Sequence, residues 1–323
     1  MTAEPPSRGN SAAITFFSPD ETRGLLSAFG AFFVWGCSPV YFKWLSHVSP
    51  IEIISHRIIW SSVLVLLLIL STRKIGQLLE IYRDPRRLFV FVLTTVLIGG
   101  NWLTFVWAIS NDRILEGSLG YYINPLVNIL LGMIFLGERL NKWQTVSILC
   151  AVAAVTILTI QVGYLPWISL VLAFSFGFYA LLRKKTGADS AVGLVVETTL
   201  LFPVALGYLL YLTFTVDPAT STEAPTGFLF DTSTLLLLVG TGVVTAVPLI
   251  LFTTAAKYLK FTTIGVLQYL SPTMHVFIAV YLYNEPFDQS RLFAFALIWI
   301  GLIIYSVDGY RGRRRPAVLK GVP

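Results

Sequence analysis

Long apolar runs separated by short polar segments are the feature that most constrains this chain. There are ten such runs of roughly 20 residues, the length that an α-helix needs to cross a bilayer. Of the 323 residues 55 % are hydrophobic and only 12 % are charged, too few to cover a water-soluble fold. The sequence therefore predicts an all-α membrane protein with ten transmembrane helices. The predicted spans are 24–44, 51–71, 88–110, 116–136, 143–161, 164–182, 191–214, 233–255, 262–283 and 289–308.

The basic residues predict how these spans are oriented. If the amino terminus is cytoplasmic, 19 of the 23 Lys and Arg residues lie in cytoplasmic segments, three lie outside, and Arg57 lies within a span. This bias predicts that both termini are in the cytoplasm. The net charge of +6 is thus explained by topology, and no nucleic-acid partner is expected. The lipid bilayer is the expected surrounding.

The sequence repeats itself weakly after five spans. An offset of 147 residues relates Tyr122 to Tyr269, Pro125 to Pro272 and Glu138 to Glu285, and an offset of 141 fits the start of each half. Because five is odd, the second half is expected to be inverted relative to the first, as in many secondary transporters. The predicted segments are a polar cytoplasmic tail at 1–22, one five-helix repeat at 23–161, a second at 162–310, and a basic cytoplasmic tail at 311–323.

Ionisable side chains inside the predicted spans are the main candidates for function, because burying them in lipid is costly. Arg57 suits an anionic ligand or a buried carboxylate partner; a structural ion pair or snorkelling to the head groups is the alternative. His56 lies on one helix face with Glu52 and Trp60. Glu197 is either a proton or cation site or a structural acid. The candidate proton-coupling residues are His56, Glu116 and Glu197.

Small and polar residues recur every four positions along the fourth span, from Glu116 to Gly132. This stripe is expected to face the protein interior, where close helix packing is the alternative to ligand binding. Pro125, Pro248 and Pro272 are expected to break their helices, since proline frees the carbonyl four residues back. Together these features favour a central cavity. The candidate substrate-binding residues are Arg57, Trp60, Asn101, Trp102, Tyr121, Asn124, Asn128, Gln268, Tyr269 and His275.

At these residues the chain resembles the RarD-type proteins of the EamA family, within the drug/metabolite transporter superfamily. The motifs are His56-Arg57-Ile58-Ile59-Trp60, Gly99-Gly100-Asn101-Trp102, Ser118-Leu119-Gly120-Tyr121-Tyr122-Ile123-Asn124-Pro125, Gly137-Glu138-Arg139, Glu197-Thr198 and Gln268-Tyr269. The resemblance implies two EamA repeats, ten spans and a permease of the inner membrane. RarD-like members are tied by name to chloramphenicol sensitivity, while the wider family exports amino acids and other metabolites. His275 departs from the RarD pattern, and the glutamates Glu138 and Glu285 are expected to be structural caps or anchors.

A secondary transporter that exports a small metabolite or drug-like solute by alternating access is the leading interpretation. No phosphate-binding G-x-x-x-x-G-K-[ST] loop occurs, so ATP is not the expected direct fuel. A passive channel, an assembly partner and an intramembrane enzyme remain alternatives, the enzyme being the least favoured. Cys37 and Cys150 are expected to be small buried hydrophobes, and neither a metal nor a cofactor is expected. The substrate stays open, and a homodimer is one option for assembly.

Overall fold

The computed structural model describes residues 18–110, 114–163, 166–215, 226–284 and 289–314. Within these ranges the chain is helical, and ten helical segments are long and apolar enough to cross a membrane. The helices are α1 (Pro19–Trp44), α2 (Pro50–Ser71), α3 (Ile75–Arg83), α4 (Pro85–Ser110), α5 (Ile114–Leu136), α6 (Lys142–Val162), α7 (Trp167–Thr186), α8 (Ser190–Thr215), α9 (Thr232–Tyr258), α10 (Phe261–Gln268), α11 (Leu270–Phe277), the π-helix η1 (Ile278–Leu282) and α12 (Gln289–Arg314).

The ten predicted spans are confirmed, and the differences lie at their ends. The predicted polar tail is helical from Pro19, where the Ser18 side chain accepts a hydrogen bond from the Glu21 backbone and caps α1. The predicted basic tail is helical as far as Arg314. The short helix α3, which the sequence analysis did not predict, joins α2 to α4. The remaining parts of both predicted tails lie outside the described residues.

The three prolines that were expected to break helices behave differently. Near Pro272 the span is interrupted at Tyr269, where α10 gives way to α11 and then to η1. By contrast, α5 continues through Pro125 and α9 through Pro248, so the prediction of breaks there is wrong. A proline removes only one intrahelical hydrogen bond. Neighbouring helices support both continuous helices, since α5 packs between α7 and α10, and α9 between α1 and α2.

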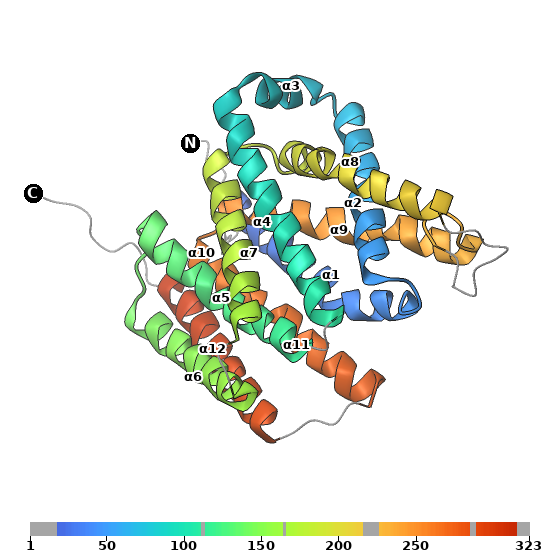
Figure 1. Cartoon of the computed structure of the whole chain (residues 1–323). Coiled ribbons are helices and arrows are strands. Elements are labelled where there is room, and N and C mark those ends of the chain that lie inside the picture. Colours follow the sequence, from blue (N-terminus) through green and yellow to red (C-terminus); the bar gives the residue numbers. More distant parts are fainter. Residues whose placement is uncertain (1–17, 111–113, 164–165, 216–225, 285–288, 315–323) are drawn as a thin grey trace, which may run out of the picture.

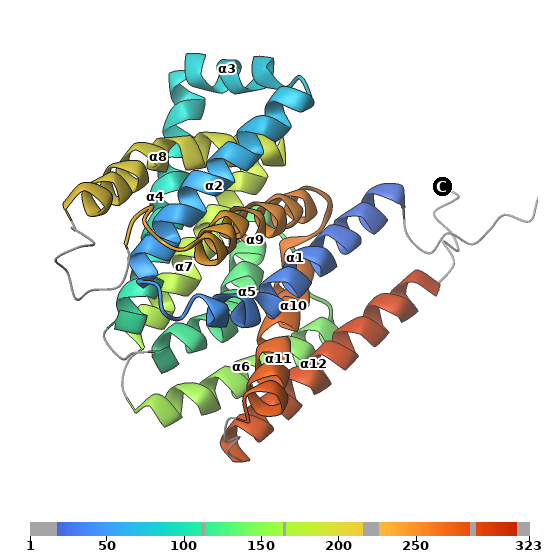
Figure 2. The same cartoon turned by 90° about the vertical axis from the view of Figure 1, so that its right-hand side faces the viewer.

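The two halves pack against each other in a reciprocal pattern (Figures 1 and 2). Helix α1 packs on α9, and its counterpart α7 packs on α4. Helix α2 packs on its counterpart α8, and the last span of each half, α6 and α12, lie along each other. With five spans in each half, the second half runs in the opposite direction to the first. The fold is therefore two inverted five-helix repeats.

One end of the bundle, here called the terminal end, carries the start of α1 and the end of α12. Several contacts join the two halves there. Lys74 forms an ion pair of 2.7 Å with Asp189, and the Arg23 guanidinium lies 5.3 Å from the ring centroid of Tyr258. The Glu138 carboxylate accepts hydrogen bonds from the backbone N–H groups of Phe261 and Thr262 at 2.7 and 2.9 Å. Glu138 thus caps the beginning of α10, in agreement with its expected structural role.

Candidate functional site

Arg57 lies on α2, seven residues after the helix begins at Pro50, and therefore about 10 Å from the end opposite the terminal end. Its guanidinium carbon lies 5.3 Å from the ring centroid of Phe42 and 5.2 Å from that of Trp102. Its Nε donates a 2.9 Å hydrogen bond to Thr245 Oγ1 on α9. Side chains of α1, α2, α4 and α9 thus converge on one cation. Contacts of this kind with aromatic rings stabilise a desolvated cation by about 2 kcal/mol.

Close packing of α2 on α9 holds this cation in place. An ideal Cβ at Gly242 would lie only 2.6 Å from the Trp60 carbonyl carbon, so the α9 backbone meets α2 directly at this level. The next turn of α9 carries Thr245, the hydrogen-bond acceptor for Arg57. A larger residue at position 242 would therefore push α9 away from Arg57.

Tyr121 extends the site toward α11. It lies seven residues after α5 begins, at the same depth as Arg57, with which it interacts electrostatically. Its ring packs edge-on against Phe105 and against His275, at centroid distances of 5.8 and 5.9 Å. With 42 % of its surface accessible, Tyr121 forms the outer edge of this site. We call Arg57, Phe42, Trp102, Tyr121 and Thr245 the Arg57 cluster.

His275 has a hydrogen-bonding role that the sequence analysis did not foresee. Its Nε2 lies 3.0 Å from the backbone carbonyl oxygen of Trp35 on α1. Pro39 lies inside α1 four residues later, so this carbonyl has lost its usual helical donor. The Ser38 hydroxyl donates to the same oxygen at 2.7 Å. The overlooked signal was Pro39 within the first apolar run.

Within the described chain, Arg57 has no carboxylate at ion-pair distance, although other buried charges do. The contrast is Arg183 on α7, whose Nε lies 3.5 Å from Glu197 Oε1 with both side chains about 1 % exposed. Arg57 is only partly buried, and its described neighbours are rings and a hydroxyl. The Arg57 cluster thus presents a fixed positive charge with aromatic walls, suited to hold an anionic group.

Asn124, Asn128 and Gln268 form a second, buried group that joins α5 to α10. Asn128 Nδ2 donates to Gln268 Oε1 at 2.7 Å, and Gln268 Nε2 donates to Asn124 Oδ1 at 2.8 Å. Asn124 also donates to the Ala173 carbonyl on α7 at 3.2 Å. The exposed fractions are 7 % or less, so the stripe faces the interior as expected, but here it bridges helices instead of lining an open cavity. Asn128 Oδ1 has no hydrogen-bond partner among the described residues.

Asn101 joins α4 to α7 nearby. Its side-chain amide donates to the Leu172 carbonyl at 2.8 Å and to Ser175 Oγ at 2.9 Å. The following residue is Trp102 of the Arg57 cluster, so Asn101 fixes the part of α4 that presents this ring. Its own amide group is engaged by α7, so we assign it a positioning role in this conformation.

Glu197 and His56, two of the three candidate proton-coupling residues, lie toward opposite ends of the bundle. Glu197 on α8 accepts hydrogen bonds from Thr94 (2.7 Å) and Tyr179 (3.2 Å), besides its ion pair with Arg183. His56 is fully buried near the other end of the bundle, where its Nε2 lies 2.9 Å from the Gly227 carbonyl oxygen. The side chain of Glu116 lies outside the described residues.

Glu52 and Trp60 complete the surroundings of His56. Glu52 Oε1 accepts a 2.8 Å hydrogen bond from the Gly227 N–H, and Trp60 Nε1 donates to His56 Nδ1 at 3.2 Å. The shared helix face predicted for these three residues therefore binds the segment that precedes α9. Trp60 is engaged in this contact and is not part of the Arg57 cluster.

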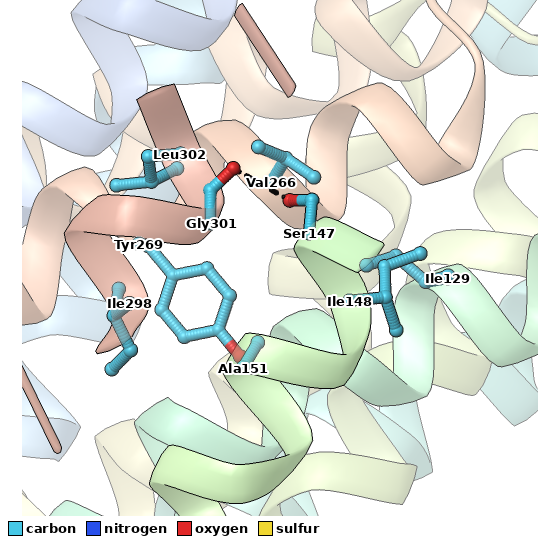
Figure 3. Close-up of a pocket in the computed structure, with 9 residues that line it drawn as sticks. All are labelled: Ile129, Ser147, Ile148, Ala151, Val266, Tyr269, Ile298, Gly301 and Leu302. Atoms are coloured by element: carbon cyan, nitrogen blue, oxygen red, sulfur yellow. Dashed lines mark hydrogen bonds between the residues drawn. The ribbon is translucent and has the colours of Figure 1, made fainter. Parts of the chain in front are cut away.

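Tyr269 lies in a separate place, between the fifth and tenth spans. It is 2 % exposed, and its hydroxyl donates to the Tyr122 carbonyl at 3.1 Å. With Ser147, Ala151, Ile298 and Gly301, it lines a void of about 10 Å³ between α6 and α12 (Figure 3). A void of this size holds at most about one water. The structure thus separates Tyr269 from the other aromatic candidates.

Several residues of the site escaped the sequence analysis because their partners are distant in the chain. Phe42 and Thr245 carried no signal beyond being aromatic or hydroxylated within a span. Arg183 was counted only as a topology charge, although it is 3 % exposed. No three His, Cys, Asp or Glu side chains come together as a metal site in the part of the chain that the structure describes.

Comparison with known proteins gives a consistent result over nearly the whole chain. The profile of the EamA-like transporter family matches residues 22–160 and 164–307, one match for each half. An "Uncharacterized transporter" of Vibrio cholerae is 44 % identical, over 92 % of this chain and 97 % of that protein. "Protein RarD" of Escherichia coli is 42 % identical, over 91 % of this chain and 97 % of that protein. A solved crystal structure with 18 % identity matches with a TM-score of 0.67, over 90 % of this chain and 98 % of that one.

Proposed function

We propose that this chain, which belongs to the EamA-like transporter family, is a secondary transporter. It would export a small metabolite or drug-like solute by alternating access. Its ten spans and its similarity to transporters and to RarD proteins make it a multi-pass membrane transporter of RarD type. We place it in the inner membrane with both termini in the cytoplasm, because of the strong bias of basic residues toward the terminal end. The Arg57 cluster then lies in the outer half of the membrane.

The observation that carries this proposal is the cation at Arg57, which has no described carboxylate partner. A charged side chain within a span costs several kcal/mol when it is left uncompensated. Aromatic contacts and one hydroxyl offset only part of that cost. An incoming anionic group would complete the pairing, and Arg, with its planar fork of donors, binds carboxylates and phosphates well. We infer a solute with an anionic group next to an apolar or aromatic body.

Contacts between the two repeats occur at both ends of the bundle. At the terminal end, Lys74–Asp189 and Glu138–Phe261 join the repeats. At the opposite end, Glu52 accepts a hydrogen bond from the Gly227 N–H, and His47 Nε2 lies 3.2 Å from Thr234 Oγ1. Alternating access requires the contacts at one end to hold while those at the other end separate, so that the substrate site opens to each side in turn.

The test is binding to the full-length protein, purified and reconstituted in liposomes. A ligand that binds the folded state raises the unfolding temperature as its concentration rises. We would screen amino acids, organic acids and drug-like anions, and then repeat each hit with Arg57→Ala and Arg57→Lys. Loss of a charge-assisted contact weakens binding by about 1.5–3 kcal/mol, so Arg57→Ala should bind at least about tenfold more weakly.

The matched control is Lys43→Ala. Lys43 lies near the same end of the bundle and also contacts a ring, with its Nζ 5.4 Å from the centroid of Tyr283. It is not a member of the Arg57 cluster, so its loss should leave binding unchanged. If a hit binds equally well to wild type and Arg57→Ala, the proposed site is wrong. A hit weakened as much by Lys43→Ala as by Arg57→Ala would reflect general charge at this end and not the cluster.

A further inference from the structure

A cleft of about 250 Å³ opens at the terminal end, far from the Arg57 cluster. It lies where the start of α1, the end of α2, the start of α8 and the end of α9 meet. Three basic side chains line it, Arg23, Lys74 and Lys257, together with the single acidic side chain of Asp189. One water needs roughly 10–15 Å³ of such space, so the cleft has room for a much larger polar group. Its excess of positive charge favours an anion.

The charges in this cleft are unequally engaged. Both oxygens of Asp189 are occupied, Oδ2 by Lys74 Nζ at 2.7 Å and Oδ1 by the backbone N–H groups of Ala191 and Val192 at 3.0 and 3.3 Å. Lys257, by contrast, makes no hydrogen bond or ion pair with any described residue. Arg23 is held by a ring contact with Tyr258, which leaves its five N–H donors free of a described carboxylate. Two cations therefore remain to bind a ligand.

The hydroxyl groups beside these cations are engaged with each other. Ser190 Oγ, at the start of α8, lies 3.0 Å from Thr254 Oγ1 on α9, and Thr254 donates its only hydroxyl hydrogen to the Ile250 carbonyl, so Ser190 donates to Thr254. A ligand in the cleft would therefore meet the charged donors of Arg23 and Lys257. Guanidinium and ammonium donors around one space bind the oxygens of a phosphate. Basic pockets between spanning helices bind anionic lipid head groups in the same way.

We propose that this cleft is a binding site for a phosphate-bearing anion, held by Lys257 and Arg23. Arg23 comes from the first repeat, and Lys257 comes from the second. A phosphate held between them would bridge the two repeats at the end where Lys74 and Asp189 already join them. The ligand would thereby favour the conformation in which the terminal end is closed. Its source is either the head group of an anionic phospholipid or a soluble phosphate.

The experiment uses the full chain in neutral detergent and measures its unfolding temperature. One arm adds phosphatidylglycerol or, for comparison, phosphatidylcholine, and the other titrates inorganic phosphate at constant ionic strength. The variants are Lys257→Gln and Arg23→Gln. The control is Lys260→Gln, which removes an exposed basic residue three positions beyond Lys257 that does not line the cleft.

We expect the anion to stabilise wild type and Lys260→Gln equally. Each cleft variant should bind it about fivefold more weakly, equivalent to about 1 kcal/mol for one basic residue. Stabilisation by phosphatidylglycerol alone identifies a lipid head group, and stabilisation by inorganic phosphate as well identifies a soluble anion. Equal responses in all four proteins, a response to phosphatidylcholine as large as that to phosphatidylglycerol, or no response to either anion would overturn the proposal.

Discussion

Removing Arg183 should destabilise the protein far more than removing Arg183 and Glu197 together. The two side chains are each 1 % exposed, and the Arg183 Nε to Glu197 Oε1 distance is 3.5 Å. Arg183 Nε and Nη1 make no hydrogen bond among the described residues, so the interaction is mainly one of charge with charge. Breaking such a pair by removing one partner costs about 3–5 kcal/mol, because the other charge is left buried. We therefore expect Arg183→Met to lose about 3–5 kcal/mol of unfolding free energy.

The double variant Arg183→Met/Glu197→Gln removes both charges and keeps the side-chain volumes similar. Thr94 and Tyr179, which donate to Glu197, can still bond the oxygen of a glutamine. Replacing both partners of a buried pair is often neutral, so the double variant should recover most of the loss. The assay is reversible unfolding by SDS in mixed micelles for the four proteins of the cycle. A double variant whose loss equals the sum of the two single losses would refute the assigned pairing.

Four further outcomes are expected. Gly193→Ala should destabilise the protein about as much as Arg183→Met in the same assay, because an added Cβ would lie 1.6 Å from Arg183 Nη1. Combining Gly193→Ala with Arg183→Met should lower the unfolding free energy little further. Glu138→Gln should lower the unfolding free energy by about 1–3 kcal/mol, because a glutamine has one side-chain oxygen and can accept only one of the two hydrogen bonds from α10. An unchanged unfolding free energy would exclude the role of Glu138 as the cap of α10. Partial burial disfavours ionisation of Asp189, but Lys74 and two backbone N–H groups outweigh this effect and lower the pKa of its carboxyl group. The contribution of ionised Asp189 to the stability of the folded protein is therefore complete above the unfolded-state pKa of about 4. That contribution is lost as the pH falls through the lower pKa of the folded state. Asp189→Asn should flatten that part of the pH profile of the unfolding midpoint. Glu197→Gln should abolish uphill transport while leaving exchange intact if Glu197 carries the coupling proton, and an unchanged pH dependence of transport would exclude it.

Much of the fold follows from the sequence because a bilayer leaves a chain few choices. Backbone polar groups in lipid must be satisfied within the segment, so a run of roughly 20 apolar residues can only be a helix. The spacing of four between Gly120, Asn124, Asn128 and Gly132 likewise determines which face of α5 is polar. The structure confirms that this face lies against α7 and α10.

The composition of the site was harder to predict, because the polar face of a helix does not show which side chains of the neighbouring helices it will meet. Whether Arg57 meets a carboxylate or a ring depends on the rotation of α1, α4 and α9 around α2. This rotation is set by contacts such as that of Gly242 with the α2 backbone. Tyr269 illustrates the same limit, since the interruption after α10 turns it toward α6 and α12 and away from Arg57. Helix α3 was missed because its nine residues are too few for a span and its neighbouring charges had been used only to predict orientation.

The most direct test of the central claim is counterflow in proteoliposomes, using a solute that stabilises wild type but not Arg57→Ala. Vesicles are loaded with unlabelled solute, and the entry of labelled solute is followed over a range of external concentrations. A carrier that opens to one side of the membrane at a time should show saturable entry that internal solute accelerates. Both properties should be lost in Arg57→Ala and kept in Lys43→Ala. Entry that rises linearly with concentration and ignores internal solute would indicate a channel and contradict alternating access.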